Sequence, residues 1–402
     1  MSLSKSFYWG NSVSSMQTEG GWDQGGKSLS VYDIREASEN TSDWHFANDN
    51  YNNYEEDLDL IKDLGMNMYR FQISWSRVVV DGDGEFNEEG IEYYDKFIDA
   101  LIERGIEPMI CLYHFDMPLK LAEKYNGFLS REVTEAFVRY GIEMIKRFGH
   151  KVKHWITFNE QNFYQLDSEA FKLGGYLEGN QTIEELYQIQ HNVTMAHAYI
   201  ANYIHENTDC NISGMIMYQE VYPATSHPKD VFVARQFDEF ANHNLIEVFV
   251  HGRYPDSFWA AVENNNIDLN LKDGDLDVLS KVYSDYLTFS YYQSLVIDHR
   301  DIPEDVLPNQ YLLHGQKDNP YLEASEWNWQ IDPLGFRNII NKLYARYKLP
   351  VFPIENGIGV IEEWDGENPI QDDYRIKYMG DHIQALKDAV EIDGAEVIGY
   401  LG

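Results

Sequence analysis

The 402-residue sequence predicts an α/β protein, a (β/α)8 TIM barrel, and three observations support this fold class. Eight short runs of apolar, β-branched or aromatic residues are typical of buried parallel strands. Amphipathic stretches separate the runs, as helices separate parallel strands. Two of the runs close on a glutamate, where the mouth of such a barrel is expected. An open doubly wound sheet also fits the alternation.

The eight expected strands are spaced by segments of helix length. Their ranges are 7–14, 66–75, 107–114, 152–160, 211–218, 286–292, 349–356 and 395–402. The segments that start near Tyr54 and Ile91 have apolar residues at helical spacing and end near Gly65 and Gly105. No linker or low-complexity stretch divides the chain, so we expect residues 1–402 to form a single domain.

The composition limits the classes of partner. Hydrophobic residues make up 44% of the chain and aromatic residues 14%, which is enough for a large core. The net charge of −36, from 31 basic and 67 acidic residues, argues against binding to nucleic acid or to an anionic membrane. No apolar signal segment and no run of membrane-spanning length is found, so we expect a cytoplasmic protein.

Polar residues at the expected strand ends form a candidate site, because the carboxyl ends of barrel strands meet at one mouth. These residues are His114, Asn159, Glu160, Tyr292, Glu355 and Asn356. Two carboxylic acids in one site can cleave a glycosidic bond. One acid protonates the leaving oxygen, while the other attacks the anomeric carbon or activates water.

Other residues suit the same chemistry. The amide of Asn159 can donate to a sugar hydroxyl beside the reacting carbon. Arg70, within the second expected strand, needs a carboxylate partner if it is buried, and Glu355 is the candidate. The aromatic residues at the strand ends either line a wall for sugar faces or belong to the core, which is the commoner role. They are Trp75, Phe115 and Trp155.

The segments around these residues resemble glycoside hydrolase family 1. The matching segments are 7–20, 113–118, 157–162 and 353–357, in the family's order. The resemblance implies a retaining mechanism in which Glu160 is the acid/base and Glu355 the nucleophile. It also implies that Gln17, His114 and Asn159 bind sugar hydroxyls, and that Arg70 and Tyr292 hold the nucleophile.

The resemblance implies a small-molecule glycoside as the substrate and leaves the oligomeric state open. We expect no cofactor. The sequence has no His-Glu-x-x-His motif and no cysteine pair, so we expect no metal site either.

Four segments favour the 6-phospho-β-glucosidase branch of the family. They are 114–119, 289–292, 324–333 and 372–376. A β-glucosidase or β-galactosidase acting on unphosphorylated sugars is an alternative, and so is an inactive carbohydrate-binding barrel. The resemblance also implies a loop and a closing helix after the eighth strand, and in the phospho branch this loop carries a Ser/Lys/Tyr phosphate clamp. Because the sequence ends at Gly402, we expect a catalytic barrel that lacks this unit.

One further motif matches the pattern of a phosphate-binding loop. The run Gly21–Ser28 fits G-x-x-x-x-G-K-[ST], which cradles phosphates in nucleotide hydrolases. Such a loop must follow directly on a buried strand, and the preceding Ser-Ser-Met-Gln-Thr-Glu is not one. We therefore expect an ordinary loop here.

Overall fold

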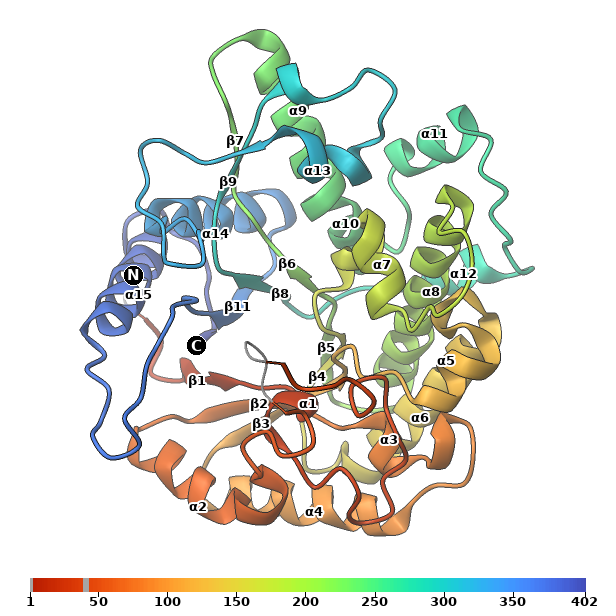
Figure 1. Ribbon diagram of the computed structural model, residues 1–402, viewed down its shortest axis with the longest axis vertical. Coiled ribbons are helices and arrows are strands. Elements are labelled where there is room, and N and C mark those ends of the chain that lie inside the picture. The colour runs from red at the N-terminus through yellow and green to blue at the C-terminus, as the bar shows by residue number, and fades with distance from the viewer. Residues whose placement is uncertain (1–2, 39–42) are drawn as a thin grey trace. The chain divides into compact units, whose positions relative to one another are not determined.

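A computed structural model describes residues 3–38 and 43–402. These residues form two compact units, which are described separately below and coloured by residue number in Figure 1. The Glu160 unit comprises residues 9–215 and 245–285. The Glu355 unit comprises residues 1–8, 216–244 and 286–402.

Five parallel strands, paired in chain order, form the sheet of the Glu160 unit. They are β1 (Tyr8–Ser12), β2 (Met68–Gln72), β3 (Glu107–Tyr113), β4 (His154–Phe158) and β5 (Asn211–Ser213). Arg70 lies opposite both Ser12 and Met109, and Tyr113 lies opposite Phe158. This register brings the carboxyl ends of β2, β3 and β4 to one edge of the sheet.

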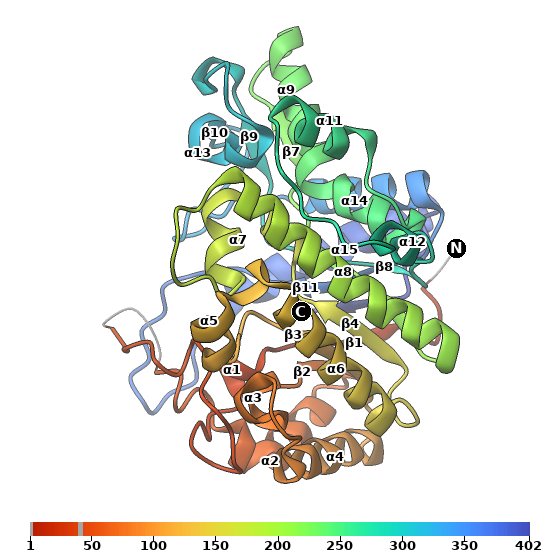
Figure 2. The ribbon, with the colours of Figure 1, turned by 90° about the vertical axis from the view of Figure 1, so that its right-hand side faces the viewer.

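Helices follow the strands of this unit. They are α1 (Ser15–Thr18), α2 (Asn50–Asp63), α3 (Trp75–Val78), α4 (Glu88–Glu103), α5 (Leu119–Tyr125), α6 (Arg131–Phe148), α7 (Asp167–Leu173), α8 (Ile183–Asn207), α10 (Asn244–His251), α11 (Asp256–Asn264) and α12 (Asp275–Leu279), with short helices η1 (Val80–Gly82), η2 (Gly127–Leu129) and η3 (Gln161–Gln165). Helix α4 packs against β3, and α6 packs beside α8 (Figure 2). Helix α6 buries Val133, Phe137, Tyr140 and Met144, which share one face at helical spacing.

Two three-stranded sheets form the Glu355 unit, with the orders β11-β8-β6 and β10-β9-β7. The strands of these sheets are β6 (Met215–Met217), β7 (Val221–Pro223), β8 (Leu287–Tyr291), β9 (Leu295–Ile297), β10 (Gln316–Lys317) and β11 (Val351–Asn356), and β12 (Gly399–Leu401) belongs to neither sheet. The helices are α9 (Pro228–Asp238), η4 (Glu239–His243), η5 (His299–Asp301), η6 (Pro308–Gln310), α13 (Tyr311–Gly315), α14 (Pro333–Tyr347) and α15 (Asp373–Glu391). Strands β8 and β11 run parallel, and α14 packs against α15.

The expected strand over 211–218 is wrong as a single element. The chain instead forms β5 and β6, which are separated at Gly214. A side chain at Gly214 would lie 2.4 Å from the ring of Phe249, so only glycine allows the backbone to pass there. The short strands β7, β9 and β10 were not predicted, because two or three residues show no periodicity.

The apolar interior contains several residues that the sequence left with two possible roles. Trp75 and Trp155 are fully buried, and Trp75 stacks on Tyr140 with ring centroids 5.5 Å apart. Both tryptophans therefore belong to the core. Cys111 and Cys210 are both buried. Within residues 3–38 and 43–402, no helix has the length and hydropathy needed to cross a membrane.

Candidate active site

Four of the predicted site residues lie at the carboxyl edge of the sheet in the Glu160 unit. Arg70 is on β2, His114 follows β3, and Asn159 and Glu160 follow β4. All four are buried. The sheet brings them together because β2, β3 and β4 are adjacent and parallel, so residues distant in sequence reach the same edge.

Arg70 and Asn159 contact each other directly. The Nη2 of Arg70 donates to Oδ1 of Asn159 at 2.7 Å, and its Nη1 donates to Oγ of Ser12 at 2.7 Å. The backbone N–H of Asn159 donates to the carbonyl of Tyr113 at 2.8 Å. These bonds fix the orientation of the Asn159 amide, since its oxygen is committed to the guanidinium and its nitrogen must point away from it.

Some buried polar atoms at this edge have no hydrogen-bond partner among the described residues. They include Nδ2 of Asn159 and Nδ1 of His114. Burial, and then the nearby charge of Arg70, hold the pKa of His114 well below its usual range. Buried polar groups in native proteins are almost always paired, so two unpaired groups in neighbouring loops indicate a place for a polar ligand. A neutral imidazole and an amide suit sugar hydroxyls, which both donate and accept.

Glu160 has an unusual backbone conformation. Its φ of 41° and ψ of 53° lie in the left-handed region, which costs a residue with a side chain about 1–3 kcal/mol. The turn places Glu160 just past β4 and ahead of the short helix η3, where its carbonyl accepts from the N–H of Phe163 at 3.0 Å. Strain of this kind persists where the surroundings hold a residue in place, and it is concentrated at functional sites.

Gln17 is positioned differently from the other candidates. It lies on the one-turn helix α1 and its side chain is exposed. The hydroxyl of Ser14 donates to Oε1 of Gln17 at 2.6 Å, which leaves the amide nitrogen of Gln17 as a donor. Its place in the sugar site remains a prediction.

In the Glu355 unit, the predicted contact between Tyr292 and Glu355 is present. The hydroxyl of Tyr292 donates to Oε2 of Glu355 at 2.7 Å. Glu355 is the penultimate residue of β11, and the register between β11 and β8 shifts between Pro353 and Glu355. Such an irregularity bends a strand and re-aims the side chain that follows it. The bond from Tyr292 orients the carboxylate and stabilises its negative charge.

A network that the sequence did not indicate holds the end of β11. The side chain of Asn356 donates to the carbonyl of Tyr291 at 2.7 Å and to the hydroxyl of Tyr378 at 3.0 Å. The hydroxyl of Tyr400 donates to Oδ1 of Asn356 at 2.7 Å. The amide is thus fully used in fixing the residue next to Glu355. Asparagine at a strand end was the only available signal, and it is also common in simple turns.

Aromatic residues extend outward from Tyr292. The ring of Trp329 lies 5.3 Å from that of Tyr292, and the ring of Trp327 lies 5.5 Å from that of Trp329. Trp329 is half-buried, whereas Trp327 is 56% exposed. The three rings form a continuous apolar surface that begins at the residue bonded to Glu355. From the sequence, these tryptophans were noted only within a segment that favours one branch of the family. No periodicity connects them to a strand end, so no role at the site was predicted for them.

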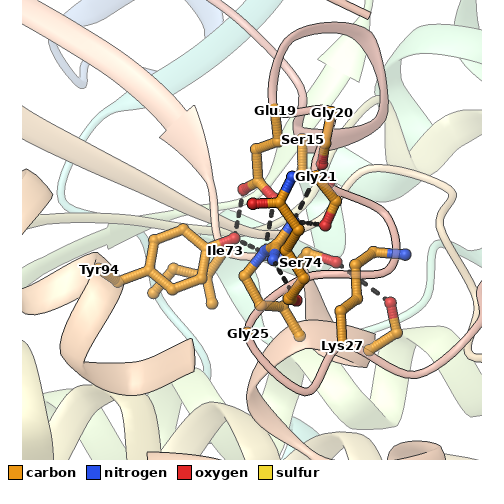
Figure 3. Close-up of polar contacts among 12 residues, drawn as sticks. Ser15, Glu19, Gly20, Gly21, Gly25, Lys27, Ile73, Ser74 and Tyr94 are labelled. Carbon is orange, nitrogen blue, oxygen red and sulfur yellow. Dashed lines mark hydrogen bonds and ion pairs between the residues drawn. The ribbon is translucent and has the colours of Figure 1, made fainter. Parts of the chain in front are cut away.

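The loop that matches a phosphate-binding motif has the wrong polarity for a phosphate. The buried guanidinium of Arg77 donates to the carbonyls of Gly20 (3.1 Å), Gly21 (3.3 Å) and Gln24 (3.3 Å). It also pairs with Glu19 at 2.9 Å, and Figure 3 shows Glu19 with Gly20 and Gly21 of this loop. A phosphate cradle directs N–H groups inward, whereas this loop directs carbonyl oxygens at a cation. The geometry supports the expectation of an ordinary loop.

One group of side chains has a spacing compatible with a metal ion. Ligand atoms of Asp230, Asp298 and His299 all lie within 4.8 Å of one another. Each of these groups already has a partner, however. Arg300 donates to both carboxylate oxygens of Asp298, and Thr225 and His299 bond to Asp230. The guanidinium already supplies the local positive charge, so the residues do not make a convincing metal site.

The pairs that join residues of different units remain predictions. These are Glu160 with Glu355 and Arg70 with Glu355, since each carboxylate is described only within its own unit.

The family described as glycosyl hydrolase family 1 matches residues 1–402. The aryl-phospho-β-D-glucosidase BglH of Bacillus subtilis is 37% identical over 98% of this chain and 86% of its own length. The 6-phospho-β-glucosidase of Clostridium longisporum is 37% identical over 100% of this chain and 87% of its own length.

Solved structures are similar over the whole chain. A β-glucosidase from Thermotoga maritima in complex with glucoimidazole has a TM-score of 0.86 at 27% identity, covering 100% of this chain and 89% of that one. A rice β-glucosidase mutant in a covalent complex with glucose has the same TM-score and identity, covering 99% of this chain and 89% of that one. These similarities confirm the predicted (β/α)8 TIM barrel fold class.

Proposed function

Because this chain belongs to glycosyl hydrolase family 1 and is an O-glycosyl hydrolase, we propose that it cleaves 6-phospho-β-glucosides by double displacement. The observation that carries the mechanism is the hydrogen bond from Tyr292 to Glu355. A carboxylate that attacks carbon must be aimed, and a phenol donor at 2.7 Å holds one of its oxygens in place.

The first step forms a covalent intermediate. Glu160 donates a proton to the leaving oxygen while Glu355 attacks the anomeric carbon, which gives a glycosyl ester of Glu355 and a free alcohol. Glu160, now ionised, takes a proton from water, and the hydroxide so formed displaces Glu355 with the original configuration restored. The rice β-glucosidase structure that carries covalent glucose, which is 27% identical to this chain, supports a covalent route.

The remaining residues bind and orient the sugar. His114 and Asn159 offer buried atoms that have no partner in the described part of the chain and that can bond to a sugar hydroxyl, and Gln17 adds a side-chain amide. Arg70 holds the oxygen of Asn159 and, in the proposed site, pairs with Glu355. Trp329 and Trp327 form an apolar wall for the leaving group, because sugar and aryl faces stack on aromatic rings.

The choice of a phosphorylated substrate rests on the relatives. Two proteins 37% identical to this chain bear the names of phospho-β-glucosidases. An unphosphorylated β-glucoside is the second candidate, which the likeness to the Thermotoga maritima β-glucosidase favours. The net charge of −36 also opposes an anionic substrate unless positive groups act locally.

A phosphorylated substrate also bears on location and organisation. Because a sugar phosphate does not cross a bilayer unaided, the proposed substrate fits a cytoplasmic enzyme. We propose further that residues 1–402 act as one catalytic domain, since the family match extends over all of them.

The test compares the purified protein on p-nitrophenyl β-glucoside and on its 6-phosphate. Faster turnover of the 6-phosphate supports the proposal, and faster turnover of the plain glucoside supports the second candidate. Glu355→Ala should abolish turnover, and azide should restore part of it by replacing the nucleophile. Glu391→Ala, an exposed glutamate at the end of α15, is the matched control and should behave as the wild type. A folded protein that turns over neither substrate contradicts the proposal and favours a carbohydrate-binding role.

A further inference from the structure

Asp116 is a buried carboxyl group that no step of the proposed mechanism uses. It lies two residues after His114, between β3 and α5, and is 1% exposed. A carboxyl group at such a depth is costly unless its hydrogen bonds are satisfied. The partners of Asp116 therefore indicate its role.

Asp116 closes a ring of hydrogen bonds with Gln72 and Ser15. The amide nitrogen of Gln72 donates to Oδ1 of Asp116, and the hydroxyl of Ser15 lies 3.2 Å from Oδ2. The same hydroxyl donates to Oε1 of Gln72 at 2.9 Å, and the backbone N–H of Ser15 donates to that oxygen at 3.0 Å. All three side chains are buried.

The ring joins three separate segments of the Glu160 unit. Ser15 is the first residue of α1, Gln72 is the last residue of β2, and Asp116 follows β3. Helix α1 has only four residues, and the side chain of its N-cap residue Ser14 does not cap the first N–H groups of the helix. A single turn has little stability of its own, and its first N–H groups need partners from outside. Gln72 supplies one of these partners, and Asp116 fixes Gln72.

The donors and acceptors balance when Asp116 is neutral. The Ser15 hydroxyl has one hydrogen but lies near two acceptors, Oε1 of Gln72 and Oδ2 of Asp116. A proton on Oδ2 can be donated to Ser15, so that every donor in the ring meets one acceptor. Burial raises the pKa of Asp116 to about 7, although hydrogen bonds from Gln72 and Ser74 and the charge of Lys27 lower it. The titratable groups that also act on Asp116 or feel its charge are Glu19, Tyr32, Tyr113, Tyr140 and Tyr164.

We propose that Asp116 is a positioning residue that acts through Gln72 and Ser15 to hold α1 against the segment after β3, so that Gln17 and His114 keep their places for one sugar. The inference rests on the proposed function, in which these two residues bind sugar hydroxyls. The side chain of Gln17 accepts a hydrogen bond from Ser14, which directly precedes Ser15 of the ring. Loss of the ring therefore releases the whole turn that bears Gln17.

The test is a double-mutant cycle on the intact chain. The variants are Asp116→Asn, Asp116→Ala, Gln17→Ala and the Gln17→Ala/Asp116→Ala pair. Two quantities are measured for each, kcat/KM on the p-nitrophenyl substrate that the wild type prefers and the Kd for glucoimidazole. Asparagine can accept from Gln72 and donate to Ser15, so Asp116→Asn should stay within about twofold of the wild type. Asp116→Ala should lose about tenfold in both quantities, the size of one lost buried hydrogen bond.

The cycle separates positioning from general stability. If Asp116 acts by keeping Gln17 in place, the loss of kcat/KM caused by Asp116→Ala should shrink to less than about threefold when Gln17 is already alanine. Asp275→Asn is the structural control, because Asp275 is equally buried in the same unit but bonds to His191 and Arg131. It should lower the thermal midpoint without changing kcat/KM or the Kd.

The outcomes distinguish failure of the positioning role of Asp116 from failure of the proposed function. This inference is overturned if the effects of Gln17→Ala and Asp116→Ala are additive, or if Asp116→Asn is as impaired as Asp116→Ala. In either case, turnover by the wild type still supports the proposed function. A wild type that binds glucoimidazole without turnover contradicts the proposed function, and the Kd values still test the ring. A chain that does neither overturns both. If Asp116→Ala does not fold, Ser15→Ala removes only the hydroxyl from the ring and should give a smaller loss that Gln17→Ala also absorbs.

Discussion

Replacing Asp116 by asparagine should change how the stability of the protein depends on pH. The carboxyl group has an ordinary pKa of 3.8, and burial raises it to about 7 in the folded chain. A raised carboxyl pKa means that the folded state binds a proton which the unfolded state has released. The stabilisation from this group is complete below the unfolded pKa and is lost as the pH rises through the folded one. Asp116→Asn removes this pH dependence, because the asparagine amide does not titrate.

The magnitude follows from the shift. A difference of about three pKa units corresponds to about 4 kcal/mol over the full range, since each unit is worth about 1.4 kcal/mol. The lower part of this pH range is unsuitable for unfolding measurements, because the sequence pI is 4.5 and proteins associate near zero net charge. Between pH 5.5 and pH 8, the free energy of unfolding of the wild type should fall by about 2 kcal/mol relative to Asp116→Asn.

Urea unfolding of both proteins at pH 5.5, 6.5, 7 and 8 measures this difference. Subtracting one curve from the other removes the contributions of all other titrating groups. Thr134→Val is the control, because Thr134 is fully buried and bonded to the carbonyl of Asn192 but has no proton to exchange in this range. It should change the stability by the same amount at every pH. Parallel curves for the wild type and Asp116→Asn would show that Asp116 does not titrate as burial implies.

Three other expectations concern catalysis and the buried ion pair. Glu160→Ala should slow substrates with poor leaving groups far more than p-nitrophenyl glycosides, and equal losses on both would count against its role as the acid. A crystal structure should place the carboxyl groups of Glu160 and Glu355 about 5–5.5 Å apart, because a separation of about 6.5–9.5 Å belongs to inverting enzymes. Arg77→Met leaves the buried carboxylate of Glu19 without its cationic partner and should lower the free energy of unfolding, measured with urea, by about 3–5 kcal/mol. Lys96→Met breaks only the exposed pair with Glu92 and should change stability little; comparable losses for the two variants would contradict this account of burial.

Much of the candidate site was predictable because its chemistry is encoded locally. Glu160 and Glu355 each follow an apolar run, and strands of that kind end at a defined edge of a parallel sheet. The resemblance also implied that Tyr292 holds Glu355, and its hydroxyl donates to that carboxylate, while the roles of the two residues stay a prediction. The family match over residues 1–402 confirms the lineage that these segments indicated.

Other parts were not predictable, because they depend on neighbours that are distant in the chain. The ring of Ser15, Gln72 and Asp116 joins residues up to 101 positions apart, and each of the three is an ordinary polar residue in its own segment. The break between β5 and β6 depends on Phe249, which lies beyond any local window around Gly214. The register shift before Glu355 is equally invisible in a run that simply looks apolar.

The sequence by itself determined the alternation of strands and helices, the lineage, and which side chains stand at strand ends. These properties follow from periodicity and from short motifs, which act over a few residues. Only the tertiary structure decided which polar atoms are paired. It committed the oxygen of Asn159 to Arg70, left Nδ2 of Asn159 and Nδ1 of His114 without partners among residues 3–38 and 43–402, and buried Asp116 within a closed ring. Hydrogen bonding and burial depend on what surrounds an atom in space, and that information exists only once the strands have been assembled side by side.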